Sequence, residues 1–164
     1  SYTNTAYILL GGNIHPRKSF LQKAEEQISI ETGKIIAKSK IYETESWGFE
    51  AEDNFLNQLI IIGTNLTAED LLNKLLEIEK EHGRVRDSKK GYTSRTLDAD
   101  IIYFNKDIIN EEKLIVPHPR LHLRKFVLEP LCEIAPEYIH PVLKKTNSEL
   151  LAECHDESKV LTLD

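Results

Sequence analysis

The sequence contains no methionine, only two cysteines and a single tryptophan among its 164 residues. The cysteines, Cys132 and Cys154, stand far apart and in no metal-ligand spacing, which argues against a disulfide framework and against a structural zinc site. Unpaired thiols fit a reducing compartment, so we expect a cytoplasmic protein. Because methionine is absent, we do not expect Ser1 to be the encoded start.

Long apolar runs are also missing. The early run over residues 6–10 is too short for a signal-peptide core or a membrane span, and no later segment reaches membrane length. Acidic residues outnumber basic ones, and the net charge of −6 weighs mildly against a general nucleic-acid binder. With no repeat, low-complexity tract or linker, the chain suits one domain over residues 1–164, which we expect to be a monomer without nucleic-acid or membrane partners.

Apolar patterning predicts the order strand, helix, strand, strand, helix, strand. The expected strands cover residues 6–10, 34–42, 54–64 and 95–104, and the expected helices cover about 16–32 and 67–82. The glycines after residue 10 should break the first strand, either in a plain tight turn or in a loop whose backbone approaches a ligand. Residues 127–164, which contain three prolines, are predicted as loops, a short helix and a last strand.

This order is the βαββαβ arrangement of ferredoxin-like α+β domains. It predicts an antiparallel sheet with both helices packed on one face and the other face open for ligands, followed by a C-terminal extension.

The chemistry of the chain centres on the stretch Arg-Thr-Leu-Asp-Ala-Asp-Ile-Ile-Tyr-Phe at residues 95–104. Because successive side chains of a strand point to opposite faces, Asp98 and Asp100 should share a face, with Cα atoms roughly 6.6 Å apart. Two ionised carboxylates this close repel each other unless a cation lies between them, and hard oxygen ligands favour Mg²⁺. The alternative is the solvated face of an ordinary strand.

Two basic clusters flank this pair. Residues 84–95 hold five basic residues against one acid, and they lead directly into Asp98. A metal held by carboxylates and a set of basic side chains together form a polyphosphate site. The alternative, which is more common for a run of charges, is a solvated face. A second cluster, with Arg120, Arg124 and Lys125, follows His118, which is structural unless its segment returns to the metal.

Several single residues admit two interpretations. Phe55 and Asn57 share a face at the start of the third expected strand, where a ring and an amide suit a flat heterocycle; the alternative is a core ring and a turn-pairing amide. Trp47, in the loop over residues 43–53, either covers a ligand or docks on the body. Glu79 borders the apolar stripe of the second helix and either faces a site or pairs with a surface cation.

Five segments together resemble the 6-hydroxymethyl-7,8-dihydropterin pyrophosphokinases of folate biosynthesis. They are Ala-Tyr-Ile-Leu-Leu-Gly-Gly-Asn at 6–13, Phe-Leu-Asn at 55–57, Gly-Arg-Val-Arg at 83–86, Arg-Thr-Leu-Asp-Ala-Asp-Ile-Ile at 95–102, and Val-Pro-His at 116–118 continuing to Phe126. Their order and spacing match that family. The chain departs from it at Thr93-Ser94, where Gly-Pro is common, so either Gly91 or Tyr92 replaces the usual loop aromatic.

The resemblance implies transfer of pyrophosphate from ATP to the hydroxymethyl group of 6-hydroxymethyl-7,8-dihydropterin, with release of AMP and with two Mg²⁺ ions. It assigns the metals to Asp98 and Asp100 and makes Arg84 and Arg95 catalytic with them. It lines the ATP with Glu79, Arg84, Arg86, Lys89, Tyr92, Arg95, Ile101, Lys113, His118 and Arg124. It places the pterin between Phe55 and Phe126, beside Thr44, Trp47 and Asn57.

Two other functions are open to a ferredoxin-like chain with these features. A palm-type nucleotidyl transferase also binds two metals on such a sheet, but it usually has a further carboxylate on a neighbouring strand. A non-catalytic ligand-binding module needs neither the basic loop nor the carboxylate pair.

Overall fold

The structure of the chain is a computed structural model that describes residues 1–44, 54–82, 84–85 and 95–163; for residues 84, 85, 95 and 96 it describes the backbone alone. The elements are, in chain order, β1 (Asn4–Gly12), α1 (Arg17–Glu31), β2 (Gly33–Lys38), β3 (Ile41–Thr44), β4 (Phe55–Thr64), α2 (Ala68–His82), β5 (Arg84–Val85), β6 (Arg95–Phe104), β7 (Ile109–Asn110), β8 (Ile115–Val116), the 3₁₀ turn η2 (Leu121–Leu123), α3 (Lys125–Ile134), α4 (Asn147–Glu153) and β9 (Val160–Leu163).

One antiparallel sheet organises these elements. Its order is β5-β6-β1-β4-β3-β9, and β2 pairs with β4 beside β3. The central strands β6, β1 and β4 are therefore the last, first and third strands of the expected βαββαβ unit. This arrangement confirms the predicted ferredoxin-like α+β class.

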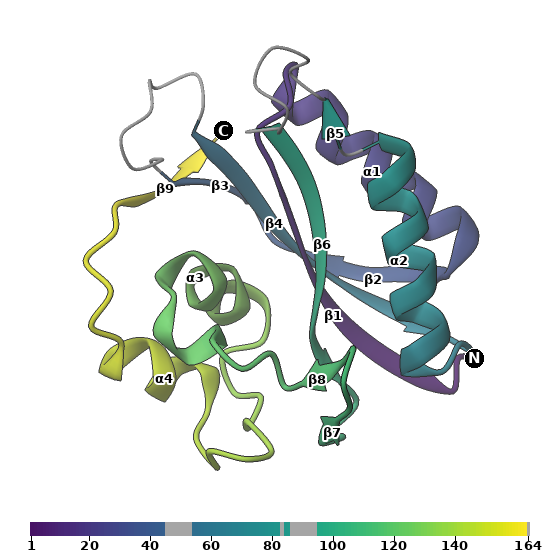
Figure 1. Ribbon diagram of the computed structural model, residues 1–164. Helices are drawn as coiled ribbons and strands as arrows, with labels where there is room; N and C mark the ends of the chain where they lie inside the picture. Colours follow the sequence, from purple (N-terminus) through teal and green to yellow (C-terminus); the bar gives the residue numbers. More distant parts are fainter. Residues whose placement is uncertain (45–53, 83, 86–94, 164) are drawn as a thin grey trace.

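Helices lie on both sides of the sheet (Figure 1). α1 and α2 cover one face, as predicted, while α3 and α4 lie on the opposite side. The expectation of a fully open second face is therefore wrong, because part of the C-terminal extension covers it. The α1/α2 side is called the helical face below, and the α3 side the second face.

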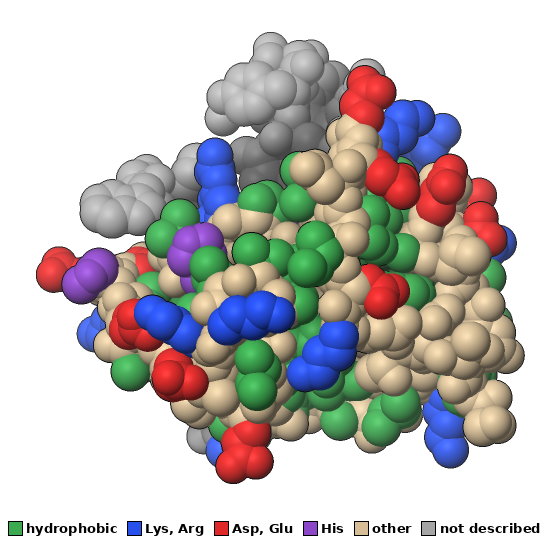
Figure 2. All heavy atoms as spheres, turned by 90° about the horizontal axis from the view of Figure 1, so that it is seen from below, with side chains coloured by type: hydrophobic (Ala, Val, Ile, Leu, Met, Phe, Trp, Pro, Cys, Tyr) green, Lys and Arg blue, Asp and Glu red, His purple; other side chains and the backbone are tan. Residues whose placement is uncertain are grey.

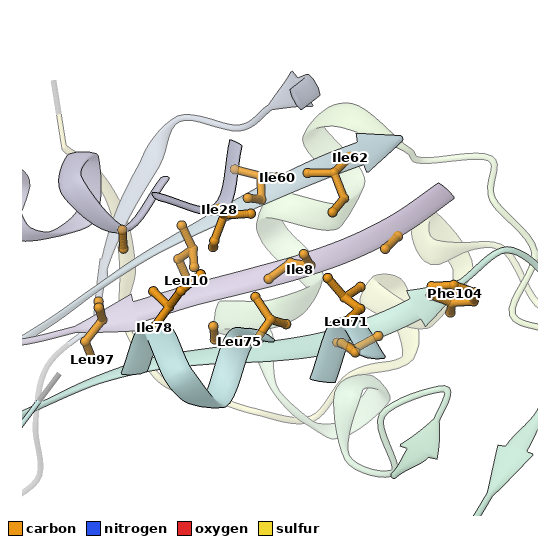
Figure 3. Close-up of a cluster of buried hydrophobic side chains, with 14 of the residues drawn as sticks. Ile8, Leu10, Ile28, Ile60, Ile62, Leu71, Leu75, Ile78, Leu97 and Phe104 are labelled. Carbon is orange, nitrogen blue, oxygen red and sulfur yellow. The ribbon is translucent and has the colours of Figure 1, made fainter. Parts of the chain in front are cut away.

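The helical face carries the larger apolar cluster (Figure 3). Ile8, Leu10 and Ile60 from the sheet meet Leu75 and Ile78 of α2, each at most 1% exposed. α2 begins where the Thr67 hydroxyl accepts a hydrogen bond from the Asp70 amide (3.1 Å), and its buried positions recur every three or four residues. Burial of this stripe, rather than helix propensity, fixes α2 on the sheet.

The second face has a smaller cluster under α3. Leu9, Leu59 and Ile102 point to this side, where they pack with apolar residues of η2, α3 and α4: Leu121, Val127, Leu128, Leu131 and Leu150. α3 was not expected, because Pro130 lies inside it. The prediction of loop over this stretch is wrong, since the buried apolar face of the helix outweighs the lost backbone hydrogen bond.

The first half of the chain differs from expectation at two further places. β1 runs on through Gly11 and Gly12, both paired on each side, so these glycines do not break the strand. The expected strand over residues 34–42 is split into β2 and β3. At the split, the Ser39 amide donates to the Leu59 carbonyl (2.9 Å) and the Ser39 hydroxyl accepts from the Leu59 amide (3.0 Å).

The underside of the molecule mixes apolar and charged side chains (Figure 2). Ile108, Ile115 and Val142 are exposed apolar residues that border a shallow hollow of about 280 Å³. None of the described helices has the length and apolar character that a membrane crossing requires.

Candidate active site

The two aspartates of β6 project from the same face of the sheet. Leu97, Ala99 and Ile101 are at most 6% exposed and belong to the helical-face cluster, whereas Asp98 and Asp100 between them are exposed. The predicted sharing of a face is confirmed, and that face is the second one. Its α3-covered part begins at the neighbouring Ile102, so the carboxylates lie beyond the cover.

A row of residues crosses the sheet from the first aspartate. Asp98 pairs with Gly11 of β1, Gly11 pairs with Asn57 of β4, and Asn57 pairs with Tyr42 of β3. Asn57 is 5% exposed, and its amide oxygen lies where a side chain on Gly11 would have to be. Because Gly11 has none, the amide takes that space, and the buried backbone of Gly11 separates it from Asp98.

Phe55 and Thr44 form the next pair on this face, two residues along β4 and β3 from Asn57 and Tyr42. Phe55 is half-buried two residues before Asn57, and Thr44 is its partner on β3. The Thr44 hydroxyl oxygen is buried and has no hydrogen-bond partner in the described structure. A buried polar atom without a partner costs free energy unless a ligand or water supplies one. Thr44 is thus suited to meet a polar ligand edge.

Phe126 and Arg124 approach from the start of α3. Phe126 packs against the second-face cluster, whose sheet members Leu9 and Leu59 stand two residues from Gly11 and Asn57 on the same face. The Arg124 guanidinium lies 5.7 Å from the centroid of the Phe126 ring. An aromatic ring and a cation therefore border the polar row on its α3 side.

A pocket of about 240 Å³ opens beside the second aspartate, at the outer edge of β6. Asp100, Ile101, Lys113 and His118 line it together, and all four were predicted to bind metal or ATP. The sequence reasoning missed four further lining residues, Leu72, Ala99, Glu112 and Pro119. Leu72 belongs to α2 and packs against the helical-face cluster.

His118 is fixed to the carboxylate strand. Its amide donates to the Ile102 carbonyl (3.0 Å), which brings residues 114–119 back to β6, and its Nδ1 accepts from the Arg120 amide at 3.3 Å. Burial lowers the pKa of His118, Arg124 and Arg120 lower it further, and Asp100 opposes the shift. The side chain is therefore a neutral imidazole at pH 7, with Nε2–H left as its donor.

Glu79 of α2 is hydrogen-bonded to β6. Its carboxylate accepts a hydrogen bond from the Ala99 amide (2.7 Å), and Ala99 is the residue between the two aspartates. Among the described residues, β5 pairs with β6 opposite Thr96 and Arg95, and further along β6 the carboxylate accepts from the Ala99 amide. The predicted contact of Glu79 with ATP stays a prediction.

Several predicted site residues lie outside the described part of the chain. They are Trp47, Arg86, Lys89 and Tyr92, together with the side chains of Arg84 and Arg95. The backbones of Arg84 and Arg95 belong to the paired strands β5 and β6.

The donor set at Asp98 and Asp100 fits a magnesium ion. The described residues contain no group of three or more His, Cys, Asp or Glu that could hold a metal on its own. Mg²⁺ is normally bound by one or two carboxylates and completes its shell with water and substrate phosphates. Two exposed carboxylates, one of them lining a pocket of about 240 Å³, meet that description.

Comparison with known families and proteins adds independent information. Residues 7–136 match the family described as 7,8-dihydro-6-hydroxymethylpterin-pyrophosphokinase. The chain is 40% identical over 151 residues to the 2-amino-4-hydroxy-6-hydroxymethyldihydropteridine pyrophosphokinase of Aquifex aeolicus, and the alignment covers 91% of each chain. It is 43% identical over 135 residues to the Bacillus subtilis protein of that name, covering 82% of this chain and 80% of that protein.

Some similar proteins are much longer. The folic acid synthesis protein fol1 of Pneumocystis carinii is 42% identical over 136 residues, which are 83% of this chain but 18% of that protein. A solved HPPK-DHPS structure in complex with substrates has a TM-score of 0.70 at 17% identity, covering 91% of this chain and 43% of that one. The Plasmodium falciparum HPPK-DHPS with pterin and p-hydroxybenzoate has a TM-score of 0.69 at 17% identity, with 93% and 43% covered. These structures support the fold.

Proposed function

Because the chain belongs to the 7,8-dihydro-6-hydroxymethylpterin-pyrophosphokinase family, we propose that it transfers pyrophosphate from ATP to 6-hydroxymethyl-7,8-dihydropterin, a step of folate biosynthesis. The observation that carries the proposal for this chain is the row Asp98–Gly11–Asn57 on one sheet face, with the pocket of Asp100, Ile101 and His118 beside it. It combines an amide, two carboxylates and an adjoining pocket on neighbouring strands.

In the proposed reaction the hydroxymethyl oxygen of the pterin attacks the β-phosphorus of ATP. A bond from that oxygen to Pβ forms, the bond from Pβ to the bridging oxygen of the α-phosphate breaks, AMP leaves with the electron pair, and the hydroxyl proton is released. Such transfers depend mainly on positioning and charge stabilisation. No described side chain is placed as a general base.

The second face holds the pterin in this proposal. Asn57 offers both a donor and an acceptor to the heterocycle edge, and the unpartnered Thr44 hydroxyl offers one more polar group. Phe55 and Phe126 supply the ring surfaces, and Trp47 belongs to the same set. The hydroxymethyl arm would then extend over Gly11 toward Asp98.

The edge of β6 holds the nucleotide. Ile101, Leu114 and Ile115 provide apolar walls for the adenine, and Lys113 lies on the same pocket wall. The Nε2–H of His118 and the guanidinium of Arg124 serve the phosphates. Arg84, Arg86, Lys89, Tyr92 and Arg95 are proposed to complete the phosphate site.

In this proposal Asp98 and Asp100 would hold two magnesium ions. When bound, Mg²⁺ neutralises phosphate charge and acidifies a bound hydroxyl. Glu79 keeps the two carboxylates in place through its hydrogen bond to the Ala99 amide.

The rival functions are less well supported. A palm-type nucleotidyl transferase would need a further carboxylate next to the pair, but the neighbours of Asp98 and Asp100 on β1 are Gly11 and Leu9, and those continue to Asn57 and Leu59 on β4. A non-catalytic binding module has no use for paired carboxylates beside a pocket.

The test is to incubate the protein with ATP, Mg²⁺ and 6-hydroxymethyl-7,8-dihydropterin and to follow AMP and the pterin diphosphate. We expect stoichiometric formation of both, dependent on all three reactants. A cyclic or polymeric nucleotide product would favour the palm-type enzyme, and binding without turnover would favour the module. Size-exclusion chromatography of the same sample tests the proposed single-domain monomer.

A further inference from the structure

We propose that Gly11 is a positioning residue, which holds the Asn57 amide in its pterin-reading orientation by leaving it the space that a side chain would fill. This inference rests on the proposed function, because it concerns how the pterin site is built. No functional role for Gly11 follows from the reaction itself.

The space around Gly11 is occupied by one group. A Cβ atom added to Gly11 would lie 2.7 Å from Oδ1 of Asn57, closer than atoms of this kind approach each other. Its next neighbours would be Cγ of Asn57 at 3.8 Å and the Leu56 carbonyl oxygen at 3.9 Å, both ordinary contacts. A methyl group here therefore displaces the Asn57 amide and spares the backbone.

The amide has little freedom to absorb that displacement. Asn57 is 5% exposed and lies inside β4, between strands β1 and β3. Buried side chains are held by close packing, so a shift of its oxygen changes the direction of both amide groups. Hydrogen-bond strength falls steeply with misalignment, and the cost appears in recognition of the heterocycle.

The buried backbone of Gly11 also lies between the two halves of the site, and it is called the floor below. With neighbouring strands about 4.8 Å apart, Asn57 and Asp98 lie roughly 10 Å from each other across β1. A substrate held by Asn57 and reacting near Asp98 must pass over Gly11. An effect on this floor and an effect on the amide are separable by experiment.

The other two glycines of the sheet whose surroundings are described have different roles. A Cβ on Gly33 would collide with the backbone carbonyl of Gly63, so Gly33 is required by the fold itself. A Cβ on Gly63 would meet the side chain of Tyr2, 2.9 Å from its ring, and Tyr2 is 46% exposed at the chain end. Gly63→Ala is therefore a matched control: a glycine of the same sheet, remote from the site.

The first experiment measures binding of 6-hydroxymethylpterin in the presence of Mg²⁺ and α,β-methylene-ATP, which cannot be cleaved at the reacting bond. We expect Gly11→Ala to weaken pterin binding by on the order of tenfold or more, with nucleotide affinity changed by less than about twofold. Gly63→Ala should leave both affinities unchanged. Unchanged pterin affinity in Gly11→Ala, with an active parent protein, would overturn the inference while leaving the proposed function intact.

A double-mutant cycle then assigns the effect to the amide. In an Asn57→Ala background, where the obstructed oxygen is gone, Gly11→Ala should weaken pterin binding by less than about twofold further. An equal loss in both backgrounds would mean that the methyl group acts through the floor and not through Asn57. If Gly11→Ala alone does not fold, the double variant must fold for the inference to stand.

A third measurement needs no substrate. In ¹⁵N-labelled protein, the side-chain NH₂ signals of Asn57 are identified by their loss in Asn57→Ala. They should move in Gly11→Ala and remain in place in Gly63→Ala. Unmoved Asn57 signals in Gly11→Ala would contradict the inference even if binding were weakened.

Discussion

The two faces of the sheet are built from the same three strands, β6, β1 and β4, but they differ in what covers them and in the polarity of their side chains. On the helical face, Leu10, Ile60 and Ala99 point into a continuous apolar cluster closed by α1 and α2. On the second face, other residues of the same strands divide between a part under α3 and a part beyond it. Leu9 and Leu59 lie under α3, and Gly11, Asn57, Asp98 and Asp100 lie beyond it.

This difference shows how one strand serves both purposes. In β6, the alternation Leu97, Asp98, Ala99, Asp100 sends every second residue into the core and the others to the site. Burial on the helical face fixes β6 in the sheet, and the carboxylates are thereby held on the second face, at the candidate site. Substitutions on the two faces should therefore separate stability from activity.

The largest separation is expected at the carboxylates. Asp98→Ala or Asp100→Ala should lower turnover by several powers of ten, on the order of 10³-fold or more, because the proposed metal loses half of its protein ligands. Both side chains are exposed, so the melting temperature should stay within a few degrees of the parent. AMP release and a thermal melt on the same preparation check both parts; a folded variant with nearly full activity would refute the metal assignment.

The reverse pattern is expected on the helical face. Leu75 is fully buried in the cluster between α2 and the sheet. Leu75→Ala should lower the free energy of unfolding by about 2–5 kcal/mol, because it removes buried methyl groups and leaves a cavity. Urea unfolding measures the loss. Turnover per folded molecule, assayed well below the melting temperature, should be within about twofold of the parent, and a collapse of turnover in fully folded protein would break the division between the faces.

Glu79, on α2, holds the strand that carries the two aspartates, so its substitution should affect both activity and stability. Glu79→Ala removes the acceptor for the Ala99 amide and should reduce kcat/KM by about tenfold with a modest loss of stability. Glu79→Gln keeps an acceptor oxygen and should retain most of the activity. Steady-state kinetics of both variants decide the matter. If Gln is as damaging as Ala, the charge of Glu79 matters more than its hydrogen bond.

The smallest effect concerns acid stability on the second face. Burial lowers the pKa of His140 from 6.5 to about 4, and the neighbouring His122 adds to the shift. Above pH 6.5 the residue is neutral in both folded and unfolded chains. Below that pH the unfolded chain binds the proton first, so stability falls as the pH drops toward 4, by at most about 2 kcal/mol at pH 5.

The substitution His140→Asn isolates the contribution of His140 to the pH dependence of stability. The Nδ1 atom of His140 accepts hydrogen bonds from the amides of Val142 (3.1 Å) and Leu143 (3.0 Å), and an asparagine oxygen can replace it. Urea unfolding at pH 5 and pH 7.5 should show a smaller difference in the variant than in the parent. Equal differences would show that His140 is not responsible.

The sequence was sufficient to predict whatever depends on local periodicity. Alternation placed Asp98 and Asp100 on one face, and the stripe of α2 identified its buried side. The family resemblance brought in Lys113 and His118, which the structure places in one pocket with Asp100. The roles of these residues in binding and catalysis stay predictions.

Long-range contacts explain what could not be predicted. β1 continues through Gly11 because it pairs there with Asn57 of β4 and with Asp98 of β6, 46 and 87 positions further on. The expected strand over residues 34–42 is split at Ser39, and the amide of Lys40 donates to the carboxylate of Glu133 on α3 (3.1 Å). Neither contact leaves a local pattern. α3 was missed for a different reason, since Pro130 is normally a sign against helix.

The short strand β9 has a consequence for handling the protein. Its four residues pair with β3 from Ile41 to Thr44, and it lies beyond the stretch that matches the family. Shortening the chain before Val160 would leave the hydrogen-bonding groups of β3 unpaired along a sheet margin, next to Thr44. An unpaired edge strand of this kind pairs readily with strands from other molecules. The truncated protein should therefore self-associate, at the end of the sheet where the pterin would bind.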